Sequence, residues 1–155
     1  MRQHLTMYAH WGANTLVVFV TALTVALAVL LHCEGLRLIS AGLNRLTSVR
    51  RRKVLFGVYA VVLLHVAEIW LFGTSLWALL QIPEAGMLTG TASASLFEVV
   101  YLSANTFTTV GFGDVVPVGA VRFLCGTEAL TGFILITWSA SFLYLEMREF
   151  WKLRA

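Results

Sequence analysis

Residues 108–114 of this chain read Thr-Thr-Val-Gly-Phe-Gly-Asp, and this short strip decides how the rest of the sequence is interpreted. Its glycines, Gly111 and Gly113, are separated by a single residue. Glycine adopts left-handed backbone dihedrals without a steric penalty, so such a strip can turn successive carbonyl groups toward one axis. A lone G-x-G more often marks an ordinary turn between helices. The flanking sequence separates the two interpretations.

A short helix is expected immediately before the strip, over residues 95–107. Ser95 and Glu98 fit a capping box, in which Ser95 accepts from the amide three residues later and the Glu98 side chain reaches back to the amide of the cap. About a dozen apolar residues are too few to cross a bilayer as a helix. The segment is therefore predicted to enter a membrane without crossing it, and Pro117 follows the strip.

The composition indicates a membrane protein, because 59% of the residues are hydrophobic and only 12% are charged. A helix needs on the order of 20 apolar residues to span the hydrocarbon core. Three blocks of sufficient length are predicted to be transmembrane helices, at residues 14–32, 54–80 and 122–147. The expected fold class is an all-α, multi-pass membrane protein.

Basic residues lie at one set of helix ends, which predicts the orientation in the membrane. Residues 33–53 carry six of them and residues 148–155 carry three, whereas residues 81–121 contain no Lys or Arg. Because basic loops stay inside, we expect a basic cytoplasmic linker at 33–53, a cytoplasmic tail at 148–155 and an extracellular N-terminus at 1–13. The protein is then placed in the plasma or inner membrane.

The basic run at residues 50–53 has a second interpretation, since such a run can bind nucleic acid or anionic lipid. It directly adjoins an apolar block, which favours a topology anchor. We therefore expect the lipid bilayer, and no nucleic acid, as a partner.

The strip and its surroundings resemble the signature of potassium channels. Residues 54–147 resemble the pore domain of the small prokaryotic members, with an outer helix at 54–80, a pore helix at 95–107, a filter at 108–114 and an inner helix at 122–147. The resemblance implies a potassium-channel pore fold to which residues 14–32 add an N-terminal helix. One departure is Phe112, where the family most often has tyrosine.

The resemblance implies a binding site for K⁺, the permeant ion, and no cofactor. Uncharged backbone carbonyls replace the hydration shell of the ion while leaving it free to move on. The filter would consist of Thr109, Val110, Gly111, Phe112 and Gly113. The ligands would be the backbone carbonyls of residues 109–112 and the side-chain hydroxyl of Thr109. Val110 and Phe112 would point away from the ion and pack against the pore helix. A single strip cannot encircle an ion, so a homotetramer is expected.

Other polar residues are expected to support this filter. Asp114 would form a ring at the outer mouth that concentrates cations, and Asn105 would hydrogen-bond to Asp114 behind the filter. Glu128, on the outer half of the inner helix, would brace the filter by hydrogen bonding near the pore helix.

The inner helix contains candidates for the gate. Gly132 occupies the position of the family's hinge glycine, but close helix packing explains Gly132 and Gly126 equally well. The side chains expected to line the cavity below the filter are Phe133, Ile136, Ala140 and Tyr144. The gating stimulus stays open between filter inactivation, bundle crossing, protons and membrane tension.

Two ionisable residues, His65 and Glu68, lie on one face of the second span, where such groups are costly. They could sense protons. The favoured alternative is that they hydrogen-bond to each other or to a neighbouring helix, an arrangement in which Glu68 could be neutral. Cys33 and Cys125 fall in different environments, so no disulfide is expected.

Two other functions fit the same sequence: a non-selective cation pore of this fold, and a non-conducting scaffold or accessory subunit. An enzyme is not expected, because neither an H-E-x-x-H zinc motif nor a phosphate-binding P-loop occurs.

Overall fold

The computed structural model describes residues 11–45 and 50–152 as four helices and two short strands. The first ten residues of the predicted extracellular segment and the last three of the predicted tail lie outside the described part. The elements in chain order are α2 (Trp11–Arg45), α3 (Arg50–Leu80), β1 (Met87–Thr89), α4 (Leu96–Phe107), β2 (Val116–Val118) and α5 (Arg122–Lys152).

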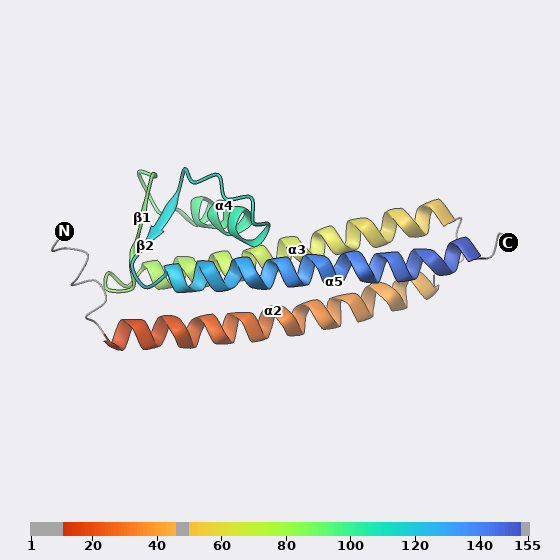
Figure 1. The fold of residues 1–155 in the computed structure, drawn as a ribbon, viewed down its shortest axis with the longest axis horizontal. Helices are drawn as coiled ribbons and strands as arrows, with labels where there is room; N and C mark the ends of the chain where they lie inside the picture. Colours follow the sequence, from red (N-terminus) through yellow and green to blue (C-terminus); the bar gives the residue numbers. More distant parts are fainter. Residues whose placement is uncertain (1–10, 46–49, 153–155) are drawn as a thin grey trace.

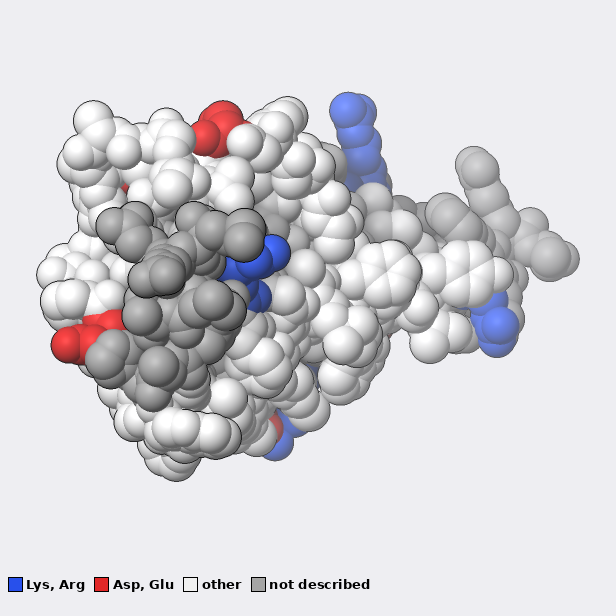
Figure 2. All heavy atoms as spheres, turned by 60° about the vertical axis from the view of Figure 1, so that its left-hand side comes forward, with Lys and Arg blue, Asp and Glu red and all other residues white. Residues whose placement is uncertain are grey.

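Three of the helices are long and apolar enough to cross a membrane, at Trp11–Arg45, Arg51–Leu80 and Arg122–Arg148. They lie side by side, with α4 and the strands at one end (Figure 1). Figure 2 brings that end forward and shows uncharged side chains over most of the visible face. Large apolar side chains point outward from the spans, such as Phe19 at 67% and Leu63 at 68% exposure. The predicted all-α membrane fold is confirmed.

The helices are longer than predicted, which corrects the boundaries of the basic linker. Helix α2 continues past residue 32 to Arg45, α3 begins at Arg50 instead of 54, and α5 continues past 147 to Lys152. The described residues of this segment, 33–45 and 50–53, are therefore helical, and residues 46–49 lie outside the described part. Falling hydropathy marks where a helix leaves hydrocarbon and not where it ends, because the backbone hydrogen bonds of a helix are internal to it.

Two glycines allow α4 to lie close to both α3 and α5. A Cβ atom on Gly73 of α3 would lie 2.8 Å from Val100 Cγ2 and 3.1 Å from its Cα. A Cβ atom on Gly132 of α5 would lie 2.2 Å from the carbonyl oxygen of Phe107. Residues that lack a side chain let membrane helices approach one another closely. The short helix is thereby held between two spans.

The strands β1 and β2 form an antiparallel pair that was not predicted. Met87 pairs with Val118, and Thr89 pairs with Val116. Just beyond β1, Gly90 has a φ of +88°, and a Cβ atom there would lie 1.8 Å from the carbonyl oxygen of Asp114. The pair thus fixes the segment that follows the glycine strip against the loop that precedes α4.

Helix α2 packs along α3 and α5, on the side of these helices away from α4 (Figure 1). Polar contacts join it to both neighbours. Thr24 Oγ1 donates to Ser75 Oγ of α3 at 3.0 Å, and Ser40 Oγ donates to Glu146 Oε1 of α5 at 2.8 Å. Hydrogen bonds of this kind hold membrane helices together.

Candidate functional site

The backbone of the glycine strip alternates in hand. Thr109, Gly111 and Gly113 have φ angles of +60°, +58° and +76°, and the two residues between them are not in the left-handed region. The left-handed conformation predicted for the glycines is confirmed. That of Thr109 was not predicted, because a threonine gives no sequence signal for a conformation that costs it about 1–2 kcal/mol.

Helix α4 anchors the start of the strip. Its N-terminus is capped by Ser95 as predicted, with the amide of Glu98 donating to Ser95 Oγ at 3.3 Å; the return bond predicted for the Glu98 side chain is not among the hydrogen bonds of the described residues. At its C-terminus, the amides of Thr109 and Gly111 donate to the carbonyls of Thr106 and Asn105 at 3.0 and 3.2 Å. The strip therefore begins at the C-terminal end of a helix, which carries a partial negative charge.

The whole strip, residues 108–114, is exposed in the single chain. Val110 is 57% exposed and Phe112 is 71% exposed. The predicted packing of these two side chains against the pore helix is therefore not made within one chain. An apolar surface of this kind is typical of an interface with another molecule.

Asp114, at the far end of the strip, has a different partner from the predicted one. The hydroxyl of Tyr101 donates to Asp114 Oδ2 at 2.7 Å, and the amide of Val115 donates to Oδ1 at 3.0 Å. Asn105 instead donates through Nδ2 to the Tyr101 carbonyl at 3.2 Å. The Tyr101 hydrogen bond holds the pKa of Asp114 below its ordinary value, and the same bond raises the pKa of Tyr101.

Glu128 of α5 is fully buried and hydrogen-bonds to Ser103 of α4, where sequence reasoning placed a brace. Ser103 Oγ also lies 2.9 Å from the carbonyl oxygen of Ile69 in α3. A hydroxyl has one hydrogen, and a carbonyl can only accept. If Ser103 donates to Ile69, the hydrogen of the bond to Glu128 has to come from a protonated Glu128. One serine thus joins three helices, and the single hydrogen of its hydroxyl can be donated to only one of Ile69 and an ionised Glu128.

The residues proposed for the hinge and the cavity lie along α5. The close approach of Gly132 to Phe107 gives that glycine a packing role, whereas a Cβ atom on Gly126 would have no neighbour within 4 Å in this chain. Among the candidates for the cavity wall, Phe133 and Tyr144 are 58% and 59% exposed, Ala140 is exposed, and Ile136 is partly buried against the core. Their role as cavity lining stays a prediction.

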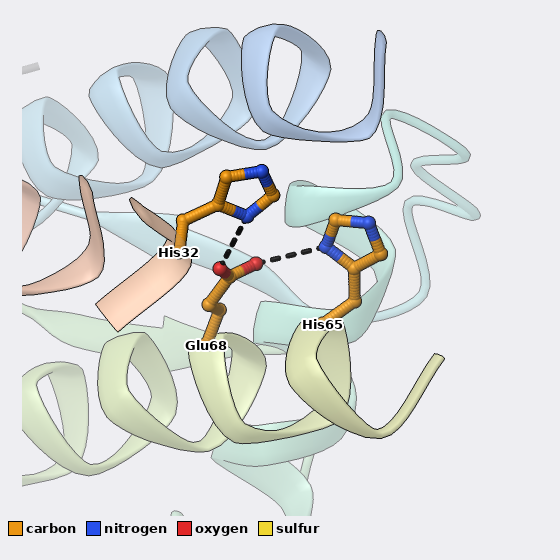
Figure 3. A group of neighbouring side chains, drawn as sticks. All are labelled: His32, His65 and Glu68. Atoms are coloured by element: carbon orange, nitrogen blue, oxygen red, sulfur yellow. Dashed lines mark hydrogen bonds and ion pairs between the residues drawn. The ribbon is translucent and has the colours of Figure 1, made fainter. Parts of the chain in front are cut away.

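A buried cluster of polar side chains joins α2 to α3. His65 Nδ1 lies 2.8 Å from Glu68 Oε2, which confirms the predicted hydrogen bond between these residues. His32 Nδ1 lies 2.8 Å from Glu68 Oε1 (Figure 3). His32 was not foreseen as a member, because nothing in the sequence relates a residue of one helix to a residue of another.

Residues 54–149 match a protein family described as "Ion channel". The chain belongs to this family. The matched residues contain α3 from residue 54 onward, α4, the strip and α5 up to residue 149, and they coincide closely with the segment predicted to form a potassium-channel pore. The predicted resemblance is thereby confirmed, and the chain is a multi-pass membrane protein of the ion-channel family. Helix α2 lies outside the matched segment.

The channel is also similar to two curated proteins. It is 34% identical over 82 residues to Protein LctB of Geobacillus stearothermophilus, an alignment that covers 53% of this chain and 61% of that protein. It is 45% identical over 40 residues to Protein LctB of Bacillus caldotenax, covering 26% of this chain and 30% of that protein. The channel thus spans less than two thirds of either relative, and no solved structure matches it significantly.

Proposed function

We propose that this ion channel conducts K⁺ selectively through a homotetrameric pore whose filter is formed by residues 109–113 of the strip. The observation that carries the proposal is the alternating hand of the strip, with φ angles of +60°, +58° and +76° at every second residue. In an ordinary strand, successive carbonyls point to opposite sides. A backbone that alternates in hand turns them toward the same side, as a row of ion ligands requires.

The chemistry of the ligands suits a weakly held monovalent cation. The carbonyls of residues 109–112 and the Thr109 hydroxyl are neutral oxygen donors, so they replace water around K⁺ without binding it tightly. Phe112 departs from the usual tyrosine only in its side chain and leaves the carbonyl ligands intact. The exposed Asp114 carboxylate, kept ionised by Tyr101, would attract cations to the outer end.

The exposed strip supports the tetramer. Four copies around one axis would surround an ion with carbonyls and close the assembly as a ring. In such a ring, Val110 and Phe112 would pack against a neighbouring chain, since they find no cover in their own. Burying these apolar side chains would contribute to assembly.

The distribution of charge supports an orientation with the N-terminus outside and the C-terminus in the cytoplasm. Residues 81–121 contain three acidic residues and no basic one. Basic residues instead lie on both sides of the junction between α2 and α3, and Arg148 and Lys152 lie near the C-terminal end of α5. By the positive-inside rule, the strip then opens to the outside of the cell membrane.

The test is a recording of purified protein in planar bilayers with opposed K⁺ and Na⁺ gradients. We expect the current to reverse close to the potassium equilibrium potential in the unmodified protein. Reversal near zero would mean a non-selective pore, and intact tetramers without current would mean a scaffold; either result refutes the proposal. The Gly111→Ala variant is expected to lose selectivity, whereas Gly12→Ala, which meets no neighbour within 4 Å, should retain it.

A further inference from the structure

Three potential metal ligands from two helices converge in the buried cluster of His32, His65 and Glu68. Each offers a ligand atom, and these atoms lie within 4.8 Å of one another. His32 comes from α2, and the other two come from α3, where they lie three residues apart on one face. Figure 3 shows both imidazole rings turned toward the two oxygens of the single carboxylate. From this geometry, we propose that the cluster binds a divalent transition-metal cation of the Zn²⁺ type, bridging α2 and α3.

The donor set is chemically suited to such an ion. Imidazole nitrogen favours zinc and its transition-metal neighbours over Mg²⁺ or Ca²⁺, and two histidines with one glutamate form a known zinc ligand set that leaves a fourth position open. Zinc binds these atoms at about 2.0–2.2 Å, so two ligands of a tetrahedral ion lie roughly 3.3 Å apart. The nitrogen–oxygen pairs, now 2.8 Å apart and made to different carboxylate oxygens, need to open by about 0.5 Å. The ligand atoms, which lie within 4.8 Å of one another, need to settle at roughly 3.3 Å around the ion.

The surrounding packing holds both rings in place. The His32 ring lies 5.2 Å from the ring of Trp138 in α5, and the His65 ring lies 5.8 Å from that of Phe107 at the end of α4. Side chains held by their neighbours lose little freedom when they bind an ion. His32 and Glu68 are fully buried, while the His65 side chain is 16% exposed and leaves an edge by which an ion can enter.

The site is distinct from the strip, and its role does not depend on which ion the strip conducts. It joins α2, which lies outside the matched family segment, to α3 within that segment. A bound metal would therefore fasten the extra helix to the pore unit. Through Phe107, it would also contact the helix that carries the strip.

The test is direct titration of the purified full-length channel in detergent with Zn²⁺, after removal of metals by a chelator. A background that carries His4→Ala, His10→Ala and Cys33→Ser removes the other histidines and the exposed thiol. We expect one Zn²⁺ per chain in this background, and a higher melting temperature with the metal. Substitution of Co²⁺ should give visible absorption bands of nitrogen and oxygen ligation without a thiolate band.

Single variants then assign the ligands. His32→Ala, His65→Ala and the nearly isosteric Glu68→Gln should each weaken Zn²⁺ binding by at least about tenfold. The Zn²⁺ titration and the Co²⁺ spectrum are measured on the background protein, which retains all three ligands. These two measurements therefore test the proposal even where a single variant fails to fold. It would be overturned by a background protein that binds no Zn²⁺, or by folded variants that bind it as tightly as the background does.

Discussion

Replacing Gly132 with alanine should destabilise the packing of α4 against α5. The added Cβ atom would lie 2.2 Å from the Phe107 carbonyl oxygen, 2.8 Å from its carbon and 2.9 Å from its Cα. All three are backbone atoms, so the clash cannot be relieved by rotating a side chain. Ordinary contact begins near 3.4 Å, and α4 would have to move away by roughly 1 Å.

The expected cost follows from two opposing effects. Overpacking a tight contact typically costs about 1–3 kcal/mol, while replacing glycine by alanine in a helix interior contributes about 1 kcal/mol of stability. The clash with fixed backbone places this site at the upper end of the first range. A net loss of about 1–2 kcal/mol per chain is therefore expected.

The assay is thermal unfolding of the purified channel, followed by circular dichroism in the same detergent. Gly126→Ala is the matched control, because it lies on the same helix and meets no atom within 4 Å. We expect a lower melting temperature for Gly132→Ala alone. An unchanged melting temperature for Gly132→Ala, or an equal loss in both variants, would refute the packing argument and return Gly132 to the role of a hinge.

Three further predictions concern the strip and its supports. Tyr101→Phe should raise the pKa of Asp114 toward its ordinary value, because the variant lacks the hydroxyl whose hydrogen bond lowers that pKa. Block of the current by acid on the outer side should then begin at a higher pH than in the unmodified channel, and an unchanged pH dependence of the block would contradict this prediction. Glu128→Gln should change the free energy of unfolding by less than about 1 kcal/mol, because the Gln side chain, like a carboxylic acid, can both accept from Ser103 and donate to it. A markedly less stable Gln variant in thermal unfolding would indicate an ionised Glu128. Gly111→Ala should cost about 1–2 kcal/mol in the left-handed conformation at φ +58° and abolish selective current, and an alanine variant with unchanged reversal potential would argue against a carbonyl filter.

The sign of the Asp114 effect follows from the direction of its shift. A carboxyl group whose pKa is lowered in the folded protein keeps its charge, and the stabilising hydrogen bond, as the pH falls through its ordinary value. The interaction is lost only when the pH falls through the lowered pKa. Without the Tyr101 hydroxyl, the pKa of Asp114 is higher, so the carboxylate loses its charge at a higher pH.

The local features of this fold could be predicted from the sequence. The Ser95 cap, the left-handed glycines and the three apolar spans each depend on residues that are close together along the chain. Helix ends were less predictable: hydropathy marks the membrane, and α2 continues as a helix through polar residues to Arg45.

Apart from the contact of Glu128 with α4, the contacts between distant segments were beyond the reach of the sequence pattern. The β1–β2 pair, the hydrogen bond from Tyr101 to Asp114 and the place of His32 beside Glu68 all join residues of different elements. Periodicity fixes which residues share a face of one helix, but not which faces meet. The packing predicted for Val110 and Phe112 is not made within one chain and stays a prediction for the assembled pore, because one chain does not supply the atoms that would cover these side chains.

Selective conduction, as proposed, requires that the carbonyl oxygens of four strips surround a dehydrated monovalent cation. The most direct test is an experimental structure of the assembled channel with Tl⁺ in place of K⁺, in which anomalous scattering locates the ion. We predict a row of Tl⁺ peaks on a fourfold axis, level with the carbonyls of residues 109–112. Strips that lie away from any symmetry axis, with carbonyls bonded inside their own chain and no Tl⁺ between subunits, would contradict the account.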